Sequence, residues 1–505
     1  MMTKLHKKVT FLLLVTISIF FTIWLESRYF PVEPDVANSP IVWQEILNTG
    51  VGAINSWQPT VDNWYFTVYP VNFITYYVLG DSGLVSLKIS TAIFSISIVF
   101  LAYGIVTAFL KKTYGAMAII LLTLIPAFGY KFGFIGHPFS HNSTNCFGLL
   151  CLLIIVTSPG KISVFRTCCL AVIATLSSLS DPWFLAAYFI PIVVYFFYIF
   201  LRDKSYVYNL LIISVFFFVS WKGFIQKIIG LPVHHFSLVP VHTMLDNLKI
   251  FPLLIGKSLN LFFVDNGIAA YLSFCVWMAV FLHSILVVIK NKHERYIDFV
   301  IISLFSVLGV VSSFVLSYAS ASEISARFFV NVTCLALIIC CLYMTSKFKI
   351  FYIIISLLFA LSSINSYANN KGPLHNQYKQ NLDYITFLRA HGLSYGYGAF
   401  WGMSNTVTWL SNGDINIIPV FFEKDNGTVD FRSSRVQTMK KWLDEKELQM
   451  APNRQFISIS TGLDGERCIS MEPCLLGIKK QLGEPDEILK YGSNIIFVYN
   501  KRLGL

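Results

Sequence analysis

Several acidic and basic side chains of this chain lie just beyond the ends of long apolar runs, where they could do chemistry at the edge of an apolar phase. A carboxylate in such a place can act as a general base that takes the proton of a hydroxyl group. Asp35 is the first candidate, because it closely follows the first apolar run, with Glu33 as the near alternative and Asp62 as a third. The competing interpretation of Asp35 is a solvated loop carboxylate or a helix N-cap.

Asp181 is a fourth candidate carboxylate, at the end of an apolar run and followed by Pro182 and Trp183. Charges at the depth of apolar segments are usually functional or paired with another group. The alternative is an Asp that caps a helix-breaking turn at the proline. Both interpretations stay open.

Arg327 is the first candidate for binding a phosphate, because its guanidinium presents a planar fork that matches two phosphate oxygens. The alternative is an interfacial arginine paired with nearby Glu323. Further candidates for phosphate or substrate binding are Lys131, His137, His141, Lys222 and Tyr69. The two histidines could share a metal, but a third ligand is not evident. We therefore expect no cofactor, with a divalent metal as the open alternative.

The elements that must position these residues follow from the charge of the connections between apolar runs. Alternate connections are basic and contain Lys4, Lys7 and Lys8; Lys111 and Lys112; Lys161 and Arg166; Arg202 and Lys204; Lys290, Lys292 and Arg295; and Lys347 and Lys349. By contrast, residues 26–81 hold six acidic side chains and a single arginine, Arg28. Because basic loops face the cytoplasm, the N-terminus is expected inside and the acidic loop outside.

Composition agrees with a membrane protein, since 55% hydrophobic, 16% aromatic and 13% charged residues cannot cover a soluble globule of 505 residues. The net charge of +11 lies mainly in the connections, so we expect no nucleic-acid partner. The first run is interpreted as a retained helix, because no small-residue cleavage site follows it. Eleven transmembrane helices are expected, near residues 10–25, 85–110, 115–133, 145–158, 165–180, 183–201, 207–227, 267–289, 297–318, 328–346 and 349–367.

Two domains are predicted: an α-helical polytopic membrane domain over residues 1–369 and a soluble C-terminal α/β domain over residues 370–505, on the outer side. The first domain carries outer loops at 26–84 and 228–266. In the first loop, residues 34–50 predict an extended Asp35 followed by an amphipathic helix that ends at Gly50. The second loop contains His234, His235 and His242 and is interpreted as an interfacial lid.

The only two cysteines of the C-terminal domain are Cys468 and Cys474, whereas the other eight lie in or beside apolar runs. An oxidising compartment would let this pair close a short loop as a disulfide. The alternative is two free thiols. A metal site usually needs more ligands than these two.

Five segments in this order resemble the bacterial GT-C glycosyltransferases, over nearly the whole chain. They are the Asp after the first helix with the helix ending in TG, an aromatic-Pro segment and LGDSGLVSLKISTAIF; GHPFSHNST; SLSDPWF; SEISARFFVNV; and the tail GLSYGYGAFWGMSNTVTWLSNGDINIIPV. Many relatives carry Asp-Glu at the first motif and His- or Lys-Pro-Pro in the second. This chain has Asp35-Val36 and Val68-Tyr69-Pro70 there, so the substrate class follows less securely than the fold.

The resemblance implies an inverting hexosyltransferase of the inner membrane, most similar to the Gtr-type O-antigen glucosyltransferases that convert serotypes. It implies transfer of a sugar, glucose first, from undecaprenyl phosphate to a periplasmic glycan such as the O-antigen of lipopolysaccharide. Partners would be membrane lipid, a flippase and a donor-synthesising glycosyltransferase. The alternatives are an aminoarabinose or mannose transferase acting on lipid A or protein, and a transporter of lipid-linked sugar. A transporter is disfavoured, because neither an internal repeat nor buried mid-helix charges are clear.

Overall fold

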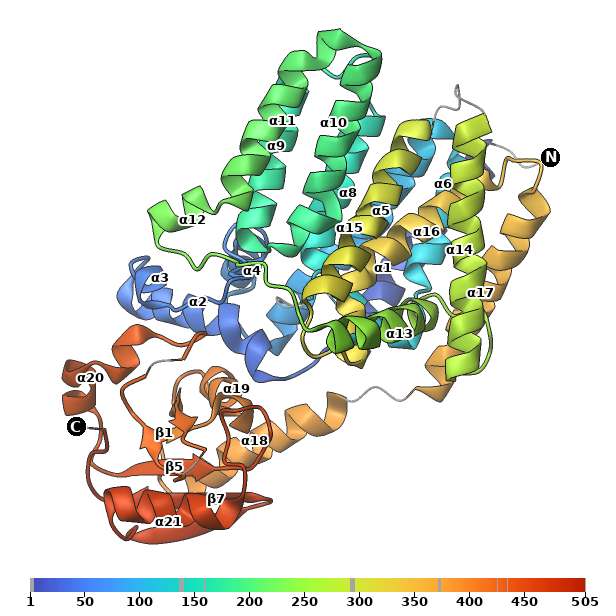
Figure 1. Ribbon diagram of the computed structural model, residues 1–505. Helices are drawn as coiled ribbons and strands as arrows, with labels where there is room; N and C mark the ends of the chain where they lie inside the picture. The colour runs from blue at the N-terminus through green and yellow to red at the C-terminus, as the bar shows by residue number, and fades with distance from the viewer. Residues whose placement is uncertain are drawn as a thin grey trace. The chain divides into compact units, whose positions relative to one another are not determined.

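The computed structural model describes residues 4–135, 140–158, 160–290, 296–370, 374–424, 426–433 and 435–504 (Figure 1). The chain divides into two compact units. Unit 1 contains residues 1–30, 61–71 and 88–372, and unit 2 contains residues 31–60, 72–87 and 373–505. Each unit is described separately below.

Unit 1 is built of helices, most of which run alongside one another (Figure 1). In chain order they are α1 (Lys4–Tyr29), α5 (Leu84–Phe109), α6 (Lys112–Thr123), α7 (Ala127–Gly129), η2 (Tyr130–Phe134), α8 (Asn142–Val156), α9 (Val164–Ser180), η3 (Leu185–Phe189), α10 (Ile190–Arg202), η4 (Lys204–Tyr206), α11 (Val207–Trp221), α12 (Phe224–Ile229), α13 (Val241–Ser258), α14 (Gly267–Lys290), α15 (Ile297–Ser317), η5 (Glu323–Phe329), α16 (Val330–Tyr343) and α17 (Lys349–Asn369). Helix α1 packs against α6.

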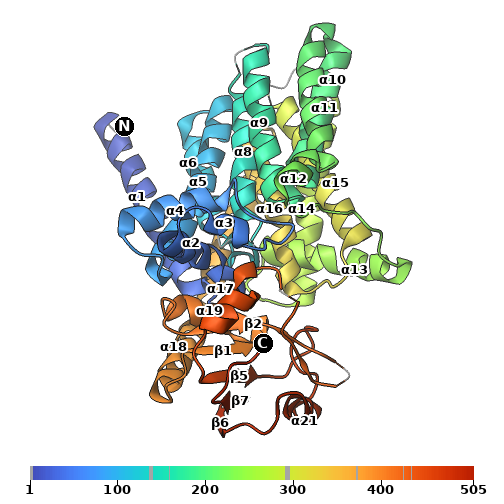
Figure 2. The same cartoon turned by 90° about the vertical axis from the view of Figure 1, so that its left-hand side faces the viewer.

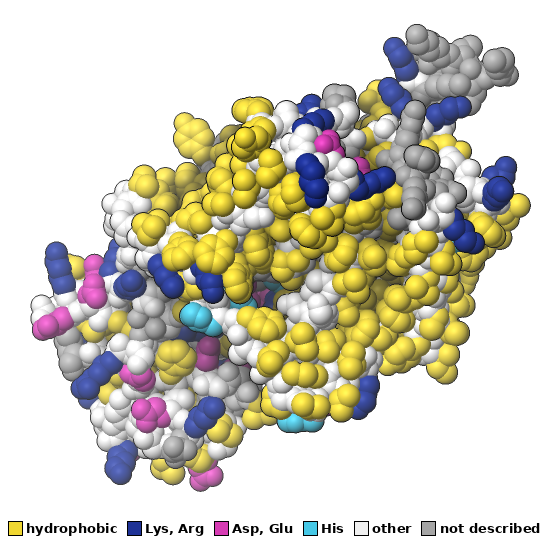
Figure 3. Space-filling model, turned by 45° about the horizontal axis from the view of Figure 1, so that its top comes forward, with side chains coloured by type: hydrophobic (Ala, Val, Ile, Leu, Met, Phe, Trp, Pro, Cys, Tyr) yellow, Lys and Arg dark blue, Asp and Glu magenta, His cyan; other side chains and the backbone are white. Residues whose placement is uncertain are grey.

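The described helices account for the eleven predicted apolar runs. Eight are long and apolar enough to span a membrane, and α6 with the segment 127–134 forms a ninth, bent span. The remaining two, α8 and α9, are apolar but contain only 15 and 17 residues. Hydrophobic side chains cover most of the helical surface in view, as expected for helices surrounded by lipid (Figure 3). Unit 1 is therefore the membrane domain of a multi-pass membrane protein.

One predicted run differs from the structure in its shape. Residues 115–133 were expected to form a single helix, but α6 and the segment 127–134 meet at an angle of 71°. The break contains Pro126, which has no N–H to continue the helical hydrogen bonds. Beyond the break the backbone of η2 widens into a π-helix, and its last carbonyl, that of Phe134, accepts hydrogen bonds from Ser95 and Asn142.

Unit 2 contains a five-stranded mixed sheet in the order β2-β1-β5-β7-β6 (Figure 2). Its strands are β1 (Tyr395–Gly398), β2 (Asn416–Pro419), β5 (Gln455–Ile459), β6 (Glu487–Tyr491) and β7 (Asn494–Tyr499), beside a small pair, β3 (Phe421–Phe422) and β4 (Val429–Asp430). Strand β1 pairs in parallel with β2 and β5, whereas β5, β7 and β6 are antiparallel. The C-terminal helices are α18 (Leu374–Ala390), α19 (Ser404–Leu410), α20 (Glu445–Met450) and α21 (Met471–Leu482), with the short turns η6 (Phe400–Gly402) and η7 (Lys440–Leu443).

This sheet confirms the predicted α/β character of the C-terminal residues. Its core includes Leu388, Val407, Phe456, Ile496 and Val498, which come from both helices and strands. Helix α18 ends before Gly392, whose φ of +65° favours glycine. The structure joins Cys468 and Cys474 by a disulfide with a Cα–Cα separation of 6.0 Å.

The division of the chain differs from the boundary expected at residue 370, because unit 2 also takes in most of the first loop. This part contains η1 (Pro34–Ala37), α2 (Asn38–Thr49), α3 (Ala53–Ser56) and the larger part of α4 (Val68–Leu79). Gln58 and the segment after Arg435 exchange backbone hydrogen bonds: Gln58 donates to the carbonyl of Thr438 (2.9 Å), and Gln437 donates to the carbonyl of Gln58. The indole of Trp409 donates to the carbonyl of Ser82 (2.8 Å). The loop thus pairs backbone groups that would otherwise be buried and unbonded.

Candidate functional site

The described part of unit 1 contains a cavity of about 320 Å³ at the ends of α9, η3 and α15. It is lined by Val61, Asp62, His141, Asp181, Pro182, Trp183, Ala186, His234, His235, Ser237, Val310, Ser313, Phe314, Ser317, Tyr318 and Phe328. Three of the candidate catalytic or binding residues, Asp62, His141 and Asp181, therefore share one cavity. An apolar wall with a few titratable groups is typical of a small-molecule site.

The centre of this wall is a buried pair formed by His141 and Asp181. Nδ1 of His141 lies 2.8 Å from Oδ2 of Asp181, and the two residues are 6% and 1% exposed. The other oxygen, Oδ1, accepts a hydrogen bond from the backbone N–H of Trp183 (3.1 Å). Asp181 thus accepts a hydrogen bond in the turn at Pro182 and is also paired with a histidine.

Aromatic rings enclose the imidazole of His141. The ring of Trp183 stacks on it with centroids 5.1 Å apart and planes 15° apart, and the ring of Phe328 lies at 4.7 Å. The indole N–H of Trp183 donates to the carbonyl of Phe328 (3.0 Å), which joins η5 to the turn after α9. The second ring nitrogen, Nε2 of His141, has no hydrogen-bond partner within the described residues. Since Asp181 orients the ring through Nδ1, this nitrogen is set to interact with a bound ligand.

Two further histidines reach the cavity from the segment between α12 and α13. His234 and His235 line it, whereas His242 lies on α13 and is not among the lining residues. Burial lowers the pKa of His234 below its ordinary value, the neighbouring His235 acts in the same direction, and the charge of Asp181 opposes both. Burial thus favours the neutral form of the His234 imidazole. The segment predicted to be a lid thus contributes directly to the cavity wall.

The structure places the other basic candidates outside this lining. Arg327 belongs to η5, and its guanidinium lies 5.5 Å from the ring of Phe328, which does line the cavity. Its expected alternative partner, Glu323, instead pairs with Lys257 at 2.7 Å. Lys131 and Lys222 are exposed and lie over the rings of Phe132 and Trp221, respectively. His137 falls outside the described residues.

Asp35 and Glu33 belong to unit 2 and are partly buried there. The segment around Asp35 is not extended as predicted, because Pro34 starts the 3-10 turn η1. The helix-cap alternative does not hold at α2, whose N-cap position is Ala37. Tyr69, which was expected to bind substrate, is 3% exposed and packs its ring 5.2 Å from that of Tyr65. It therefore serves the core of unit 1.

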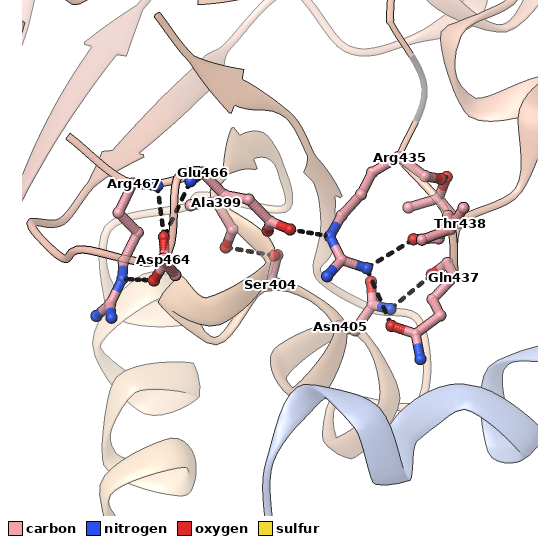
Figure 4. A network of polar contacts seen from close by, with 10 residues as sticks. Ala399, Ser404, Asn405, Arg435, Gln437, Thr438, Asp464, Glu466 and Arg467 are labelled. Atoms are coloured by element: carbon pink, nitrogen blue, oxygen red, sulfur yellow. Dashed lines mark hydrogen bonds and ion pairs between the residues drawn. The ribbon is translucent and has the colours of Figure 1, made fainter. Parts of the chain in front are cut away.

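Sequence reasoning missed a polar network in unit 2 that includes Asn405, Arg435 and Glu466 (Figure 4). These residues come from three distant segments with no recognisable motif, and an Arg and a Glu in a polar region read as solvated charges. A weak signal was the unusual density of aromatic residues around Phe400, against whose ring the Arg435 guanidinium packs at 3.5 Å. Across the described parts of both units, no three His, Cys, Asp or Glu side chains are grouped as a metal site requires.

Comparison with known proteins identifies the fold. No family model and no curated protein matches this chain. Among solved structures, ArnT from Cupriavidus metallidurans in the apo state is similar, with a TM-score of 0.59, 10% identity and coverage of 98% of both chains. The same protein bound to undecaprenyl phosphate gives a TM-score of 0.57 at 10% identity, covering 96% of this chain and 97% of that one. The Archaeoglobus fulgidus oligosaccharyltransferase gives 0.51 at 12% identity, covering 88% and 68%.

The chain therefore has the fold of ArnT and of the Archaeoglobus fulgidus oligosaccharyltransferase. The expected fold class, a polytopic helical domain followed by a C-terminal α/β domain, is thereby confirmed. At these identities the likeness concerns the fold alone. The chemistry of this chain therefore depends on its own residues, above all on the cavity that holds His141, Asp181 and Asp62.

Proposed function

We propose that this protein is a membrane glycosyltransferase that moves a sugar from a polyprenyl phosphate to an acceptor hydroxyl. The observation that carries the proposal is the cavity of unit 1, where a buried His141–Asp181 pair and two more histidines meet at the ends of apolar helices of a GT-C fold. A lipid phosphate and its sugar need this combination of an apolar wall and a few polar groups. The similar protein ArnT from Cupriavidus metallidurans binds undecaprenyl phosphate.

The proposed reaction is a single displacement. The acceptor hydroxyl oxygen attacks the anomeric carbon, the bond from that carbon to the phosphate oxygen breaks, and polyprenyl phosphate leaves with the electron pair. A carboxylate takes the hydroxyl proton, and we assign this role to Asp35, with Glu33 and Asp62 as alternatives. Inversion at the anomeric carbon follows from one displacement.

Cationic or hydrogen-bonding side chains stabilise the phosphate as its charge develops. We assign this role to Arg327 first and to His141 second. Arg327 directly precedes Phe328 of the cavity wall, and His141 lines the cavity with its Nε2 available for a hydrogen bond. Lys131 and Lys222, together with His137, are less favoured candidates. The indole N–H of Trp183, whose ring stacks on His141, donates to the carbonyl of Phe328, the residue after Arg327. This hydrogen bond connects the positions of His141 and Arg327.

The finer identity is proposed from the sequence resemblance: glucose as the sugar and O-antigen as the acceptor, in the bacterial inner membrane. The basic connections support a cytoplasmic N-terminus and a periplasmic C-terminal domain. A flippase and a donor-synthesising glycosyltransferase would supply the lipid-linked donor on that side. Periplasmic reporters fused at Asn55 and Asn426 should both be active, and activity of a cytoplasmic reporter at either position would contradict this orientation.

The experiment that tests the function expresses the chain in a bacterium that makes a smooth, unmodified O-antigen together with polyprenyl-phosphate glucose. Mass spectrometry of the lipopolysaccharide should show one added hexose per repeat unit, and none in a host without the donor synthase. Addition of aminoarabinose or mannose to lipid A or protein would favour the alternative transferase. Movement of intact donor across the membrane without any new bond would identify a transporter.

A further inference from the structure

The strongest unexplained feature outside the cavity is a buried ion pair in unit 2 (Figure 4). Nε of Arg435 donates to Oε1 of Glu466 at 2.8 Å, and the two side chains are 9% and 15% exposed. The Nη1 group of Arg435 donates to the carbonyl of Val436 and to Oε1 of Gln437, at 2.8 and 2.9 Å. The amide of Asn405 donates to the carbonyl of Gln437 (2.8 Å). These contacts hold the Arg435 side chain in place, and Arg435 in turn holds the carboxylate of Glu466.

Several acceptor atoms in this region have no partner within the described residues. They include Oε2 of Glu466 and Oδ1 of Asn405, both of which are buried. Buried polar atoms in native proteins are nearly always hydrogen-bonded, so each unpaired one requires an explanation. Leaving such an atom unbonded costs roughly 1–3 kcal/mol. Two orphaned acceptors on one network are explained if a ligand that carries hydroxyl donors binds there.

The candidate catalytic base lies beside this network in the same unit. The turn η1, which carries Asp35, packs against α19, which carries Asn405. Burial raises the pKa of Glu466, the Arg435 guanidinium opposes the rise, and the charges of Asp464 and Asp35 add to it. The Asp35 carboxylate is therefore within electrostatic reach of Glu466.

The charge of this region determines which ligand it can accept. The Nε and Nη1 groups of Arg435 are already engaged, so the orphaned atoms of Glu466 and Asn405 are the acceptors that this network offers. The Arg435 guanidinium balances the charge of Glu466, and the orphaned oxygens can accept hydrogen bonds from hydroxyl groups. An uncharged sugar carries several such hydroxyl donors and adds no charge to this ion pair.

We infer that Asn405 and Glu466 form a binding site for an uncharged acceptor sugar beside Asp35. This inference rests on the glycosyltransferase activity proposed above and deepens it, because it assigns the acceptor to the C-terminal domain. Arg435 is a positioning residue that holds Glu466 in place. The orphaned oxygens accept hydrogen bonds from the sugar, and the hydroxyl that attacks the donor gives its proton to Asp35.

The test measures the apparent KM of the full-length enzyme separately for acceptor and donor. Glu466→Gln keeps an oxygen for Arg435 and replaces the orphaned acceptor with a donor, so the KM for an O-antigen oligosaccharide should rise about tenfold. The KM for the lipid-linked donor should stay unchanged. Glu472→Gln is the matched control, because Glu472 is an exposed carboxylate on α21 of the same unit. Its acceptor KM should equal that of the wild type.

A second variant, Asn405→Ser, and a second readout protect the test against a folding defect. Both variants are first checked by thermal unfolding, and binding of the free oligosaccharide is measured by saturation-transfer NMR without any donor. Lost oligosaccharide binding in a folded variant supports the inference even if no sugar transfer is observed. An active enzyme whose acceptor KM is unchanged in both variants overturns it and leaves the proposed function standing, with ordered water as the partner of the orphaned oxygens.

Discussion

The two units bury a carboxylate in the same way but leave different atoms for chemistry. In unit 1 Asp181 is held 2.8 Å from His141, and in unit 2 Glu466 is held 2.8 Å from Arg435. The atom left unbonded is an imidazole nitrogen in the first pair and a carboxylate oxygen in the second. Aromatic rings enclose the first, whereas hydrogen-bonding groups surround the second. The first pair therefore leaves a ring nitrogen facing the cavity, and the second leaves an oxygen that can accept hydrogen bonds from hydroxyl groups.

The largest effect is expected from the base itself. Asp35→Asn removes the group that takes the acceptor proton and should lower sugar transfer by about two to four orders of magnitude, with donor binding retained. The control is Asp383→Asn, an exposed aspartate on α18 of the same unit, which should transfer sugar at the wild-type rate. Transfer at the normal rate by purified Asp35→Asn protein would remove Asp35 from the mechanism. Glu33→Gln and Asp62→Asn would then be assayed in the same way.

The buried pair of unit 1 should show strong coupling in a double-mutant cycle. Because Asp181 and His141 lie out of solvent, Asp181→Asn and His141→Gln should each lower the free energy of unfolding. The double variant should lose less free energy of unfolding than the sum of the two single losses, and the difference should be roughly 1–3 kcal/mol. The exposed pair Asp246–Lys249 is the control, with an expected coupling of about 0–1 kcal/mol. Thermal or denaturant unfolding in detergent measures both cycles. Equal coupling in the two pairs would show that burial does not distinguish them.

Arg327 tests whether a bidentate cation serves the donor and not the acceptor. Arg327→Ala should raise the apparent KM for the polyprenyl donor about ten- to hundredfold, since hydrogen bonds to charged groups contribute about 1.5–3 kcal/mol. Arg327→Lys keeps the charge without the planar fork and should lie between the wild type and Arg327→Ala. The acceptor KM serves as the internal control. If donor KM and turnover are both unchanged in Arg327→Ala, the phosphate is bound elsewhere, with His141 examined next.

The smallest effect is a pH dependence of stability that has opposite sign at two neighbouring carboxylates. Burial raises the pKa of Glu466 above 4.5, so its contribution to stability is present below that value and is lost as the pH rises through the folded-state pKa. For Asp464, burial alone would raise the pKa, but hydrogen bonds from the Arg467 and Glu466 amides and the Arg467 guanidinium hold it below 3.8. Its contribution is present above 3.8 and is lost as the pH falls through the folded-state pKa.

The free energy of unfolding of the full-length protein, measured below and above these pH values, tests the sign of the pH dependence at each carboxylate. Glu466→Gln should remove part of the loss of stability on the alkaline side, and Asp464→Asn should remove part of the loss on the acid side. The same sign in both variants would show that Glu466 is not held with its pKa raised.

The membrane helices could be predicted from the sequence because length and hydrophobicity decide them. All eleven expected runs correspond to helices of the described structure, and the misjudged feature, the bend near Pro126, is a local break. The burial of Asp181 could also be predicted, since a charge at the end of an apolar run is usually paired. Its partner, His141, could not be predicted, because the pairing joins residues 40 positions apart.

The C-terminal site was not predictable in the same way. Arg435 and Glu466 lie 31 positions apart in a polar region, where no periodicity marks a buried charge. Their burial depends on the sheet and on the first loop, which supplies Gln58 and η1 to unit 2. The same recruitment of the loop is why the domain boundary at residue 370 did not describe the observed units.

The most direct test of the proposed transfer follows the sugar of a labelled donor. Purified wild-type protein in liposomes is given undecaprenyl-phosphate glucose with a radiolabelled sugar and an O-antigen oligosaccharide on the side of the C-terminal domain. We expect the label to become covalently attached to the oligosaccharide while undecaprenyl phosphate is released in equal amount. Labelled donor that crosses the bilayer intact, with no glycosidic bond formed, would contradict glycosyl transfer as the function of this protein.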